Sequence, residues 1–233
     1  MPKLDKKLYS KQEYKNRKTF LKQQKQQSID NLQNDIVLDH IAFVLGNGIS
    51  RKSIDENELL FYGKVYGCNA IYRTFTPDYL VAVDVKMVIE INETGYQKKN
   101  IVWTNPNRAY DAMEGFNYFK PNKGWSSGPT ALWLASGHGY NKIYILGFDY
   151  MGLDSGKRVN NIYVDTKNYK KSTDGATYYG NWLRQTQSTI KQNANIQYIR
   201  VLQDNAFDPK DLTSLKNYSI LSIDLFKKMF YLT

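Results

Sequence analysis

Two polar, glycine-bearing segments, far apart in the chain, have the residue types of a phosphate-binding site. The first is Gly46–Arg51 and the second is Ser126–Gly128. Glycines let the backbone turn sharply and approach a ligand closely. In the first segment Asn47 and Ser50 offer hydrogen bonds and Arg51 offers a cation. The segment is neither a dinucleotide fingerprint nor a Walker A loop, because it lacks the third glycine and the Gly-Lys-Ser/Thr ending.

Buried elements flank both segments. The purely apolar run Ile41–Leu45 is typical of a parallel strand that is buried on both faces. The second segment opens a predicted helix, whose free N–H groups and positive dipole end favour an anion. Ile143–Leu146 predicts the next strand, which Gly147-Phe148-Asp149 follows. Ligands of open α/β sheets lie beyond the strand carboxyl ends, so the two segments predict two walls of a nucleotide pocket. A simple turn and an ordinary capped helix are the alternatives.

Strands and helices are predicted to alternate, which favours an α/β fold with a single Rossmann-like domain and a mostly parallel sheet over residues 36–233. A polar stretch without clear periodicity, 152–177, is predicted to be a lid or insert over the pocket. The predicted strands lie near 38–45, 64–68, 79–84, 100–104, 142–147 and 196–202, and the predicted helices near 85–93, 108–115, 128–137, 178–194 and 222–231.

Composition narrows the class of protein. The 233 residues suit one domain with a small appendage. No apolar run approaches the roughly 20 residues of a membrane span, and the N-terminus lacks the apolar region of a signal peptide. The single Cys68 excludes a disulfide framework and fits a reducing compartment, so we expect a cytoplasmic protein. One Cys and two His give no zinc constellation.

The net charge of +10 is unevenly distributed. Residues 1–28 hold nine Lys or Arg against Asp5 and Glu13, a net charge of +7. We expect a basic helical arm over 1–35 that attaches to an anionic partner, such as nucleic acid, a membrane surface or an acidic protein. The alternative is a solvated, solubilising face.

Five motifs in a fixed order carry a resemblance to a known family. They are Gly46–Ser50 after the first strand, Cys68-Asn69 after the second, Pro77–Asp84, Ser127–Ala131 before an apolar helix, and Gly139–Asp149. In this pattern, which covers about residues 38 to 150, the chain resembles the family 42 sialyltransferases of bacteria. It also resembles the wider group of 6-hydroxymethylpterin diphosphokinase-like and phage-encoded glycosyltransferase-like proteins.

The resemblance implies a Rossmann-like domain of the GT-A type and transfer of a sugar from a CMP-type nucleotide sugar to an unknown acceptor. In the family the early asparagines and the Ser-Gly helix start hold the nucleotide. The residues that would bind the nucleotide here are Gly46, Asn47, Gly48, Ser50, Asn69, Ser127 and Gly128.

The chain departs from the family at the general base, which is a histidine of the lid there. Here the two histidines, His40 and His138, fall outside the predicted lid. Asp149 and Tyr163 are therefore the first candidate catalytic residues, as a base at the pocket mouth and as a phosphate contact. Further candidates of the same two kinds are Asp154, Asp165 and Asp174, and Tyr169, Tyr178 and Tyr179. The missing histidine also favours a second hypothesis. In it the pocket is degenerate and the protein is a non-catalytic, phage-encoded binding or assembly component that attaches through its arm.

Asp84 ends a predicted strand at the crevice, where other GT-A enzymes hold a divalent metal on the donor diphosphate. The second carboxylate of such a site would stand two residues away, but Ala82 and Lys86 occupy those positions. A divalent metal is therefore disfavoured, and a helix cap is the alternative role of Asp84. Diphosphate transfer from ATP would need a carboxylate cluster for Mg²⁺, and only Asp84 and Asp149 are candidates for it.

Overall fold

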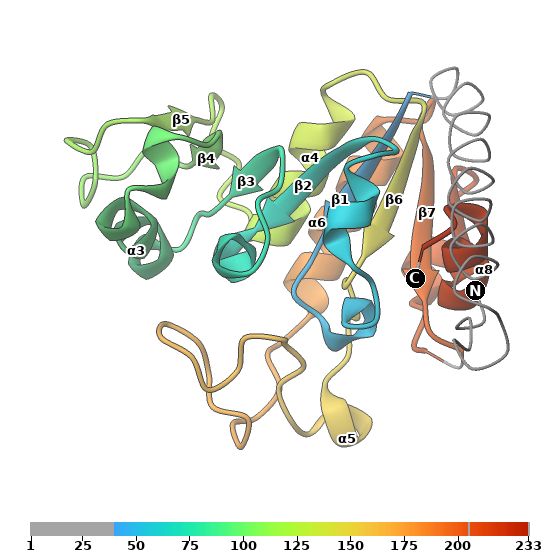
Figure 1. Ribbon diagram of the computed structural model, residues 1–233. Helices are drawn as coiled ribbons and strands as arrows, with labels where there is room; N and C mark the ends of the chain where they lie inside the picture. The colour runs from blue at the N-terminus through green and yellow to red at the C-terminus, as the bar shows by residue number, and fades with distance from the viewer. Residues whose placement is uncertain (1–39, 205, 233) are drawn as a thin grey trace, which may run out of the picture.

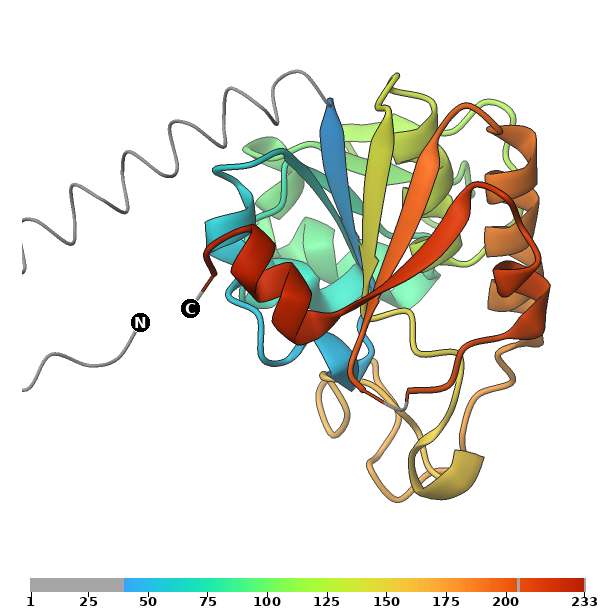
Figure 2. The same ribbon diagram turned by 90° about the vertical axis from the view of Figure 1, so that its right-hand side faces the viewer.

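The computed structural model describes residues 40–204 and 206–232. The basic arm predicted at 1–35 lies outside these residues, and so does the beginning of the strand predicted at 38–45. The described residues form a Rossmann-like α/β unit, in which helices cover both faces of one sheet (Figures 1 and 2). The predicted fold class is confirmed.

Within the described residues the sheet has eight strands, all parallel, in the spatial order β5-β4-β3-β2-β1-β6-β7-β8. Phe43 of β1 lies in register with Val65 of β2 on one side and with Tyr144 of β6 on the other. The strands are β1 Ile41–Leu45, β2 Lys64–Cys68, β3 Tyr79–Val81, β4 Val102–Thr104, β5 Phe116–Tyr118, β6 Lys142–Leu146, β7 Gln197–Leu202 and β8 Tyr218–Ser222.

The helices vary widely in length, and among the described residues none is both long enough and apolar enough to cross a membrane. The α-helices are α2 Glu56–Leu59, α3 Val85–Thr94, α4 Ser127–Ser136, α5 Leu153–Gly156, α6 Gly180–Gln192, α7 Lys210–Thr213 and α8 Ile223–Met229. The 3₁₀ turns within residues 40–204 and 206–232 are η2 Ile49–Arg51, η3 Asn69–Arg73 and η4 Tyr96–Lys98.

Alternate residues of β1 supply two hydrophobic cores, one on each face of the sheet. Phe43 packs edge-on against Phe226 of α8 and against Phe230, which follows that helix, with ring centroids 6.1 and 5.3 Å apart. Val44 belongs to the second core, on the opposite face, together with Leu132 of α4. Helices α4 and α6 cover that face (Figure 2). Burial on both faces explains why the whole strand is apolar.

The prediction of a helix over 108–115 is wrong, because that segment forms turns. The Asn107 side chain accepts a hydrogen bond from the Ala109 N–H at 2.9 Å, and the Asn107 carbonyl accepts from the Tyr110 N–H at 3.2 Å. An asparagine that bonds the backbone two residues on offers the chain an alternative to a helix. Gly115 then has a positive φ of 86° that leads into β5.

Strands β5 and β8 were not predicted, and both are edges of the sheet. In β8 Ser219 and Ile220 are exposed, so the strand has no apolar run that would mark it in the sequence. The six predicted strands are otherwise present, and helices lie at the remaining predicted places as α3, α4, α6 and α8.

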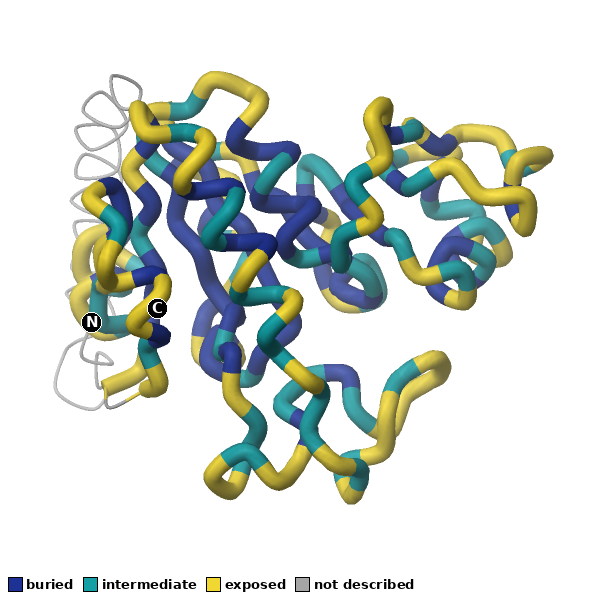
Figure 3. Tube along the Cα trace, turned by 180° about the vertical axis from the view of Figure 1, so that it is seen from behind, coloured by how far each residue is buried: buried dark blue, intermediate teal, exposed yellow. Residues whose placement is uncertain are grey.

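The strand order reverses beside β1, and this reversal positions the site. After β1 the chain builds β2 to β5 on one side and then returns to form β6 on the other side. The loops after β1 and β6 therefore flank a crevice, the usual ligand position of open α/β sheets. Residues 152–177 hang over this end of the sheet and are mostly exposed or half-buried (Figures 1 and 3).

Candidate functional site

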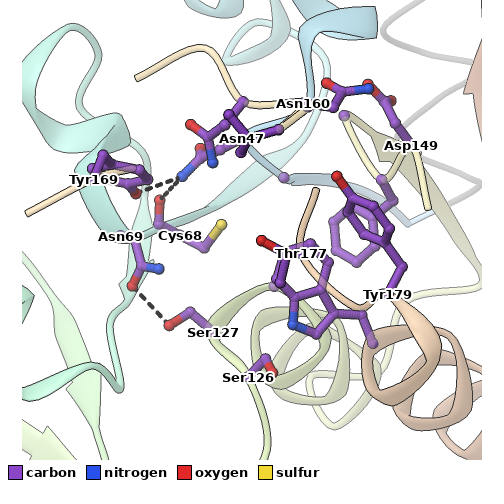
Figure 4. A pocket seen from close by; sticks show the side chains of 18 of the residues that line it. Asn47, Cys68, Asn69, Ser126, Ser127, Asp149, Asn160, Tyr169, Thr177 and Tyr179 are labelled. Atoms are coloured by element: carbon purple, nitrogen blue, oxygen red, sulfur yellow. Dashed lines mark hydrogen bonds between the residues drawn. The ribbon is translucent and has the colours of Figure 1, made fainter. Parts of the chain in front are cut away.

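A cavity of about 390 Å³ lies at the carboxyl ends of the central strands (Figure 4). Its walls come from the loops after β1, β2, β3 and β6, from the start of α4, from the 152–177 segment and from α6. The lining residues are Gly46, Asn47, Gly48, Cys68, Asn69, Asp84, Ser126, Ser127, Gly128, Pro129, Gly147, Phe148, Asp149, Tyr150, Val159, Asn160, Asn161, Val164, Asn168, Tyr169, Lys170, Thr177, Tyr179 and Trp182.

Most of the residues predicted to bind a nucleotide converge on this cavity, although they lie far apart in the sequence. Six of them line it: Gly46, Asn47, Gly48, Asn69, Ser127 and Gly128. The seventh, Ser50, is buried behind the loop and bonds the carboxylate of Asp149 through both its N–H and its hydroxyl.

Asn47 connects three segments of the cavity wall. Its Nδ2 donates to the Cys68 carbonyl at 3.2 Å and to the Tyr169 hydroxyl at 3.1 Å, while its backbone carbonyl accepts from the Ile162 N–H at 2.8 Å. The side chain is only 8% exposed. Asn47 therefore fixes the β1 loop to the end of β2 and to the 152–177 segment.

Asn69 and Ser127 form a second connection across the cavity (Figure 4). Ser127 Oγ donates to Asn69 Oδ1 at 2.7 Å and accepts from the Val83 N–H at 3.1 Å. Asn69 has a φ of 50°, in the left-handed region that asparagine tolerates better than most residues. The two side chains join the ends of β2 and β3 to the start of α4.

Glycines are required where the loops after β1 and β6 cross. Gly46 N–H donates to the Leu146 carbonyl at 2.8 Å, and Gly48 N–H donates to the Gly147 carbonyl at 2.9 Å. A Cβ on Gly147 would lie 2.6 Å from the Gly46 oxygen, and a Cβ on Gly46 would overlap the Gly147 oxygen. The sequence predicted that these glycines let the backbone approach a ligand. In the structure they let the β1 loop approach the β6 loop, because a Cβ at either glycine would meet backbone atoms of the other loop.

Arg51 is not the free cation that the sequence indicated. The side chain is 2% exposed and is not among the residues that line the cavity. Its Nε donates to the Gly46 carbonyl at 2.5 Å, and Nη1 is paired with Glu56. The guanidinium thus binds the β1 loop on the side away from the cavity. Its charge is neutralised by Glu56 of α2.

Asp149 lines the cavity after β6 and is held by the β1 loop. Its Oδ2 accepts from the Ser50 N–H at 3.2 Å, and its Oδ1 accepts from the Ser50 hydroxyl. Asn160 of the 152–177 segment lies beside it and accepts from the Ile49 N–H at 2.9 Å (Figure 4). A carboxylate therefore stands at the cavity wall with its orientation fixed.

The structure places Tyr163 away from the cavity. Its ring is buried, and its hydroxyl lies 2.9 Å from Thr74 Oγ1 and 3.4 Å from Arg51 Nη2. Tyr169 and Tyr179 line the cavity instead. Burial raises the pKa of both hydroxyls, so both are protonated donors at neutral pH.

Asp84 also lines the cavity, but its carboxylate accepts a hydrogen bond from Asn69 Nδ2 at 3.0 Å. An N–H donor at that oxygen opposes a cation in the same place, so the donor set does not fit a metal. No group of three or more His, Cys, Asp or Glu side chains gathers within residues 40–204 and 206–232. Asp84 does occupy the N-cap position of α3, although its side chain makes no cap bond there.

The start of α4 faces the cavity with its backbone donors. Ser126 is the N-cap residue, but it makes no side-chain cap bond, and its own N–H donates to Gln185 Oε1 at 3.1 Å. The first N–H groups of a helix have no intrahelical acceptor. Those of Ser127 and Gly128 therefore present partial positive charge at the cavity wall.

Several lining residues were not predicted, chiefly Asn160, Asn168 and Trp182. The asparagines lie in the polar 152–177 segment, where no periodicity singles out one residue. Trp182 reaches the cavity from the first turn of α6, where it packs edge-on against Tyr179 with ring centroids 5.2 Å apart. The spacing of Tyr179 and Trp182, three positions apart at the start of a predicted helix, is the one sequence signal that could have indicated that Trp182 lies beside Tyr179.

Comparison with known proteins gives a likeness in fold. No family model and no curated protein matches the chain. Among solved structures, the sialyltransferase CstII from Campylobacter jejuni, in complex with the substrate analogue cytidine-5'-monophosphate (CMP), is 18% identical, with 72% of this chain and 82% of that chain covered and a TM-score of 0.47. A tyrosine-to-phenylalanine variant of the sialyltransferase Cst-II in complex with CMP is 16% identical, with coverages of 71% and 82% and a TM-score of 0.43. A phenylalanine-to-tyrosine variant of the α-2,3/8-sialyltransferase CstII is 17% identical, with coverages of 72% and 83% and a TM-score of 0.43. Similarity at this level assigns no role to individual residues.

Proposed function

We propose that this chain is a glycosyltransferase of the sialyltransferase type, which takes a sugar from a CMP-type nucleotide donor. The main support is the convergence of Asn47, Asn69 and Ser127 on one cavity at the strand-order reversal. These residues come from three distant segments, and each belongs to a motif that resembles the family.

The donor phosphate would lie at the start of α4. The free N–H groups of Ser127 and Gly128 suit an anion, and Tyr179 stands across the cavity. The Tyr179 hydroxyl is buried near the Asn160 backbone without a hydrogen bond of good geometry. A buried donor of this kind gains from an acceptor, and a phosphate oxygen of the ligand would supply one.

The proposed reaction is displacement at the anomeric carbon of the donor sugar. The bond between that carbon and the phosphate oxygen breaks, and a bond to an acceptor hydroxyl oxygen forms. The acceptor proton would pass to Asp149, a carboxylate at the cavity wall, while a tyrosine hydroxyl donates a hydrogen bond to the leaving phosphate. Tyr163 has no part in this proposal, because it does not line the cavity.

Calorimetry and thermal shift with CMP, UMP and AMP would test the donor class. A ligand at about 100 times its dissociation constant stabilises the folded state by about 2.7 kcal/mol, so binding should raise the melting temperature measurably. We expect CMP to bind more tightly than the others. The absence of heat and of a melting shift with every nucleotide would overturn the proposal.

One observation favours a binding or assembly function without catalysis. Both histidines lie away from the cavity lining, and His138 Nδ1 lies 2.6 Å from the Tyr66 hydroxyl, outside the site. A protein that binds CMP but never releases it from CMP-sialic acid, with or without sugar acceptors, would support this second function.

A further inference from the structure

A largely buried ion pair lies next to the cavity. Arg73, at the end of η3, and Glu90 of α3 form a forked contact, with Nε 2.7 Å from Oε1 and Nη2 2.6 Å from Oε2. The Glu90 side chain is 8% exposed and that of Arg73 is 20% exposed. Two parallel charge-assisted hydrogen bonds fix both the distance and the orientation of such a pair.

Both partners of this pair also hold the 152–177 segment directly. Arg73 Nη1 donates to Thr166 Oγ1 at 2.8 Å, and Nη2 donates to the Lys167 carbonyl at 2.8 Å. Asn168 Nδ2 donates to Glu90 Oε2 at 2.6 Å. Three consecutive residues of the segment are thus fastened to the Arg73–Glu90 pair.

The fastened residues continue into the cavity wall. Asn168 and Tyr169 line the cavity, and the Tyr169 hydroxyl accepts from Asn47 Nδ2 and, at 3.3 Å, from the Ala70 N–H. The guanidinium carbon of Arg73 also lies 5.7 Å from the centre of the Tyr169 ring. Release of the pair would therefore free the stretch of chain that closes this side of the cavity.

Two other ion pairs of the segment are much more exposed. The side chains of Arg158 and Asp154 are 50% and 55% exposed, and those of Lys167 and Glu93 are 66% and 56% exposed. Exposed pairs contribute little because water screens them and the side chains lose entropy on pairing. The Arg73–Glu90 pair has a buried carboxylate and a largely buried guanidinium, so its loss should have a far larger effect on the position of the segment.

We propose that the Arg73–Glu90 pair is a positioning pair that keeps the 152–177 segment over the cavity, and thereby sets how fast a nucleotide binds and leaves. The closure follows from the contacts alone, and only the identity of the ligand rests on the proposed function. A ligand can pass while the segment is open, so more frequent opening raises the association and dissociation rates together.

Limited trypsin digestion of the ligand-free, full chain tests the closure. We expect Arg73→Met to speed cleavage after Lys167, Lys170 and Lys171 at least about tenfold, because the variant loses both hydrogen bonds from Arg73 to the segment and the loss of even one charged hydrogen bond produces about that change. Arg73→Lys should restore part of the protection, because lysine keeps the charge but not the fork. Arg158→Met is the matched control and should leave the cleavage rate after Lys170 and Lys171 unchanged.

A second variant is needed as a control for misfolding, because Arg73→Met leaves the Glu90 carboxylate buried without its cation and could destabilise the fold. Arg73→Met combined with Glu90→Met removes both charges, which a folded protein tolerates better. Far-ultraviolet circular dichroism verifies the fold of each variant. Cleavage at the wild-type rate in both folded variants would overturn the proposal.

Stopped-flow binding of CMP tests the effect on the ligand. We expect both rate constants to rise by a similar factor in the Arg73 variants, so that the dissociation constant changes less than either rate. Faster cleavage with unchanged CMP rates would overturn the link to ligand exchange. If the wild-type chain binds no CMP, the proposed function and the ligand part of this inference both fail, and the digestion alone decides the closure.

Discussion

Ser127 Oγ donates a hydrogen bond to Asn69 Oδ1 at 2.7 Å, across the cavity mouth from the start of α4 to the loop after β2. The same hydroxyl accepts from the Val83 N–H. The buried Ser127 hydroxyl therefore links the start of α4 to the loops after β2 and β3. The start of α4 is positioned by this contact, since the N-cap residue Ser126 makes no side-chain cap bond.

Replacement of that hydroxyl should lower the stability of the fold. Ser127→Ala leaves the Val83 N–H and the Asn69 Oδ1 without their partner, so we expect the free energy of unfolding to fall by about 1–3 kcal/mol. Urea titration followed by fluorescence measures it. Ser126→Ala is the neighbouring control and should cost much less. An equal loss of unfolding free energy in the two variants would show that the Ser127–Asn69 hydrogen bond does not stabilise the fold.

Asn47→Ala should weaken CMP binding by about 1–3 kcal/mol, because it removes the amide that holds both the Cys68 carbonyl and the Tyr169 hydroxyl. Tyr169→Phe keeps the ring and the Asn47 amide but removes the hydroxyl that Asn47 binds. A loss of affinity in Asn47→Ala alone would therefore indicate ligand contact by Asn47, and an equal loss in both variants would indicate that Asn47 acts by positioning Tyr169. Calorimetry on both variants gives the affinities. Wild-type affinity in Asn47→Ala would count against a nucleotide site at this wall.

The crossing of the β1 and β6 loops should be intolerant of any side chain at Gly46. A Cβ there overlaps the Gly147 oxygen, a backbone atom that cannot rotate away. We expect Gly46→Ala to lower the melting temperature strongly or to prevent folding. Gly175→Ala is the control, because its Cβ would meet nothing within 4 Å, and it should stay close to the wild type. A stable, well-folded Gly46→Ala protein would show that the loops can separate.

Acidification should release the Arg73–Glu90 pair. Burial alone would raise the pKa of Glu90, but hydrogen bonds from Tyr72, Arg73 and Asn168 outweigh it and hold the pKa below the usual 4.5. The stability from a depressed carboxyl pKa is fully present above about pH 4.5 and is lost as the pH falls through the folded-state value.

We therefore expect the difference in unfolding free energy between the wild type and Glu90→Gln to be constant from about pH 5.5 to 8 and to shrink below about pH 4.5. Urea titrations at several pH values measure it. A difference that instead grows on acidification would mean that Glu90 is not held as a carboxylate in the folded protein.

The basic segment 1–28 should be dispensable for the fold but necessary for any anionic partner. It carries seven of the ten net positive charges and few apolar residues. We expect a chain that begins at residue 29 to keep its melting temperature and to lose binding to nucleic acid or anionic vesicles. If nucleic acid is the partner, affinity should also fall steeply with salt. Unfolding of the shortened chain would show that the segment belongs to the core.

The sequence indicated the central architecture because burial on both faces leaves an unambiguous apolar run, as in Ile41–Leu45. It also indicated the cavity loops, because the polar, glycine-bearing segments directly follow buried strands or open a helix, at the end of the sheet where ligands of such folds lie. It could not show that Glu56 neutralises Arg51, since that pairing depends on where α2 packs. The choice of Tyr169 over Tyr163 likewise depends on the irregular path of residues 152–177, which no period in the sequence describes.

The pairing of β1 with β6 also orders events during synthesis. Ile41 lies in register with Lys142, so the chain must close a long loop before these strands meet. A nascent chain that ends before Gly147 contains β1 to β6 but lacks 14 of the 24 residues that line the cavity. A ligand of this cavity can therefore stabilise the chain only after synthesis has passed Trp182, when β1 and β6 are both available to pair.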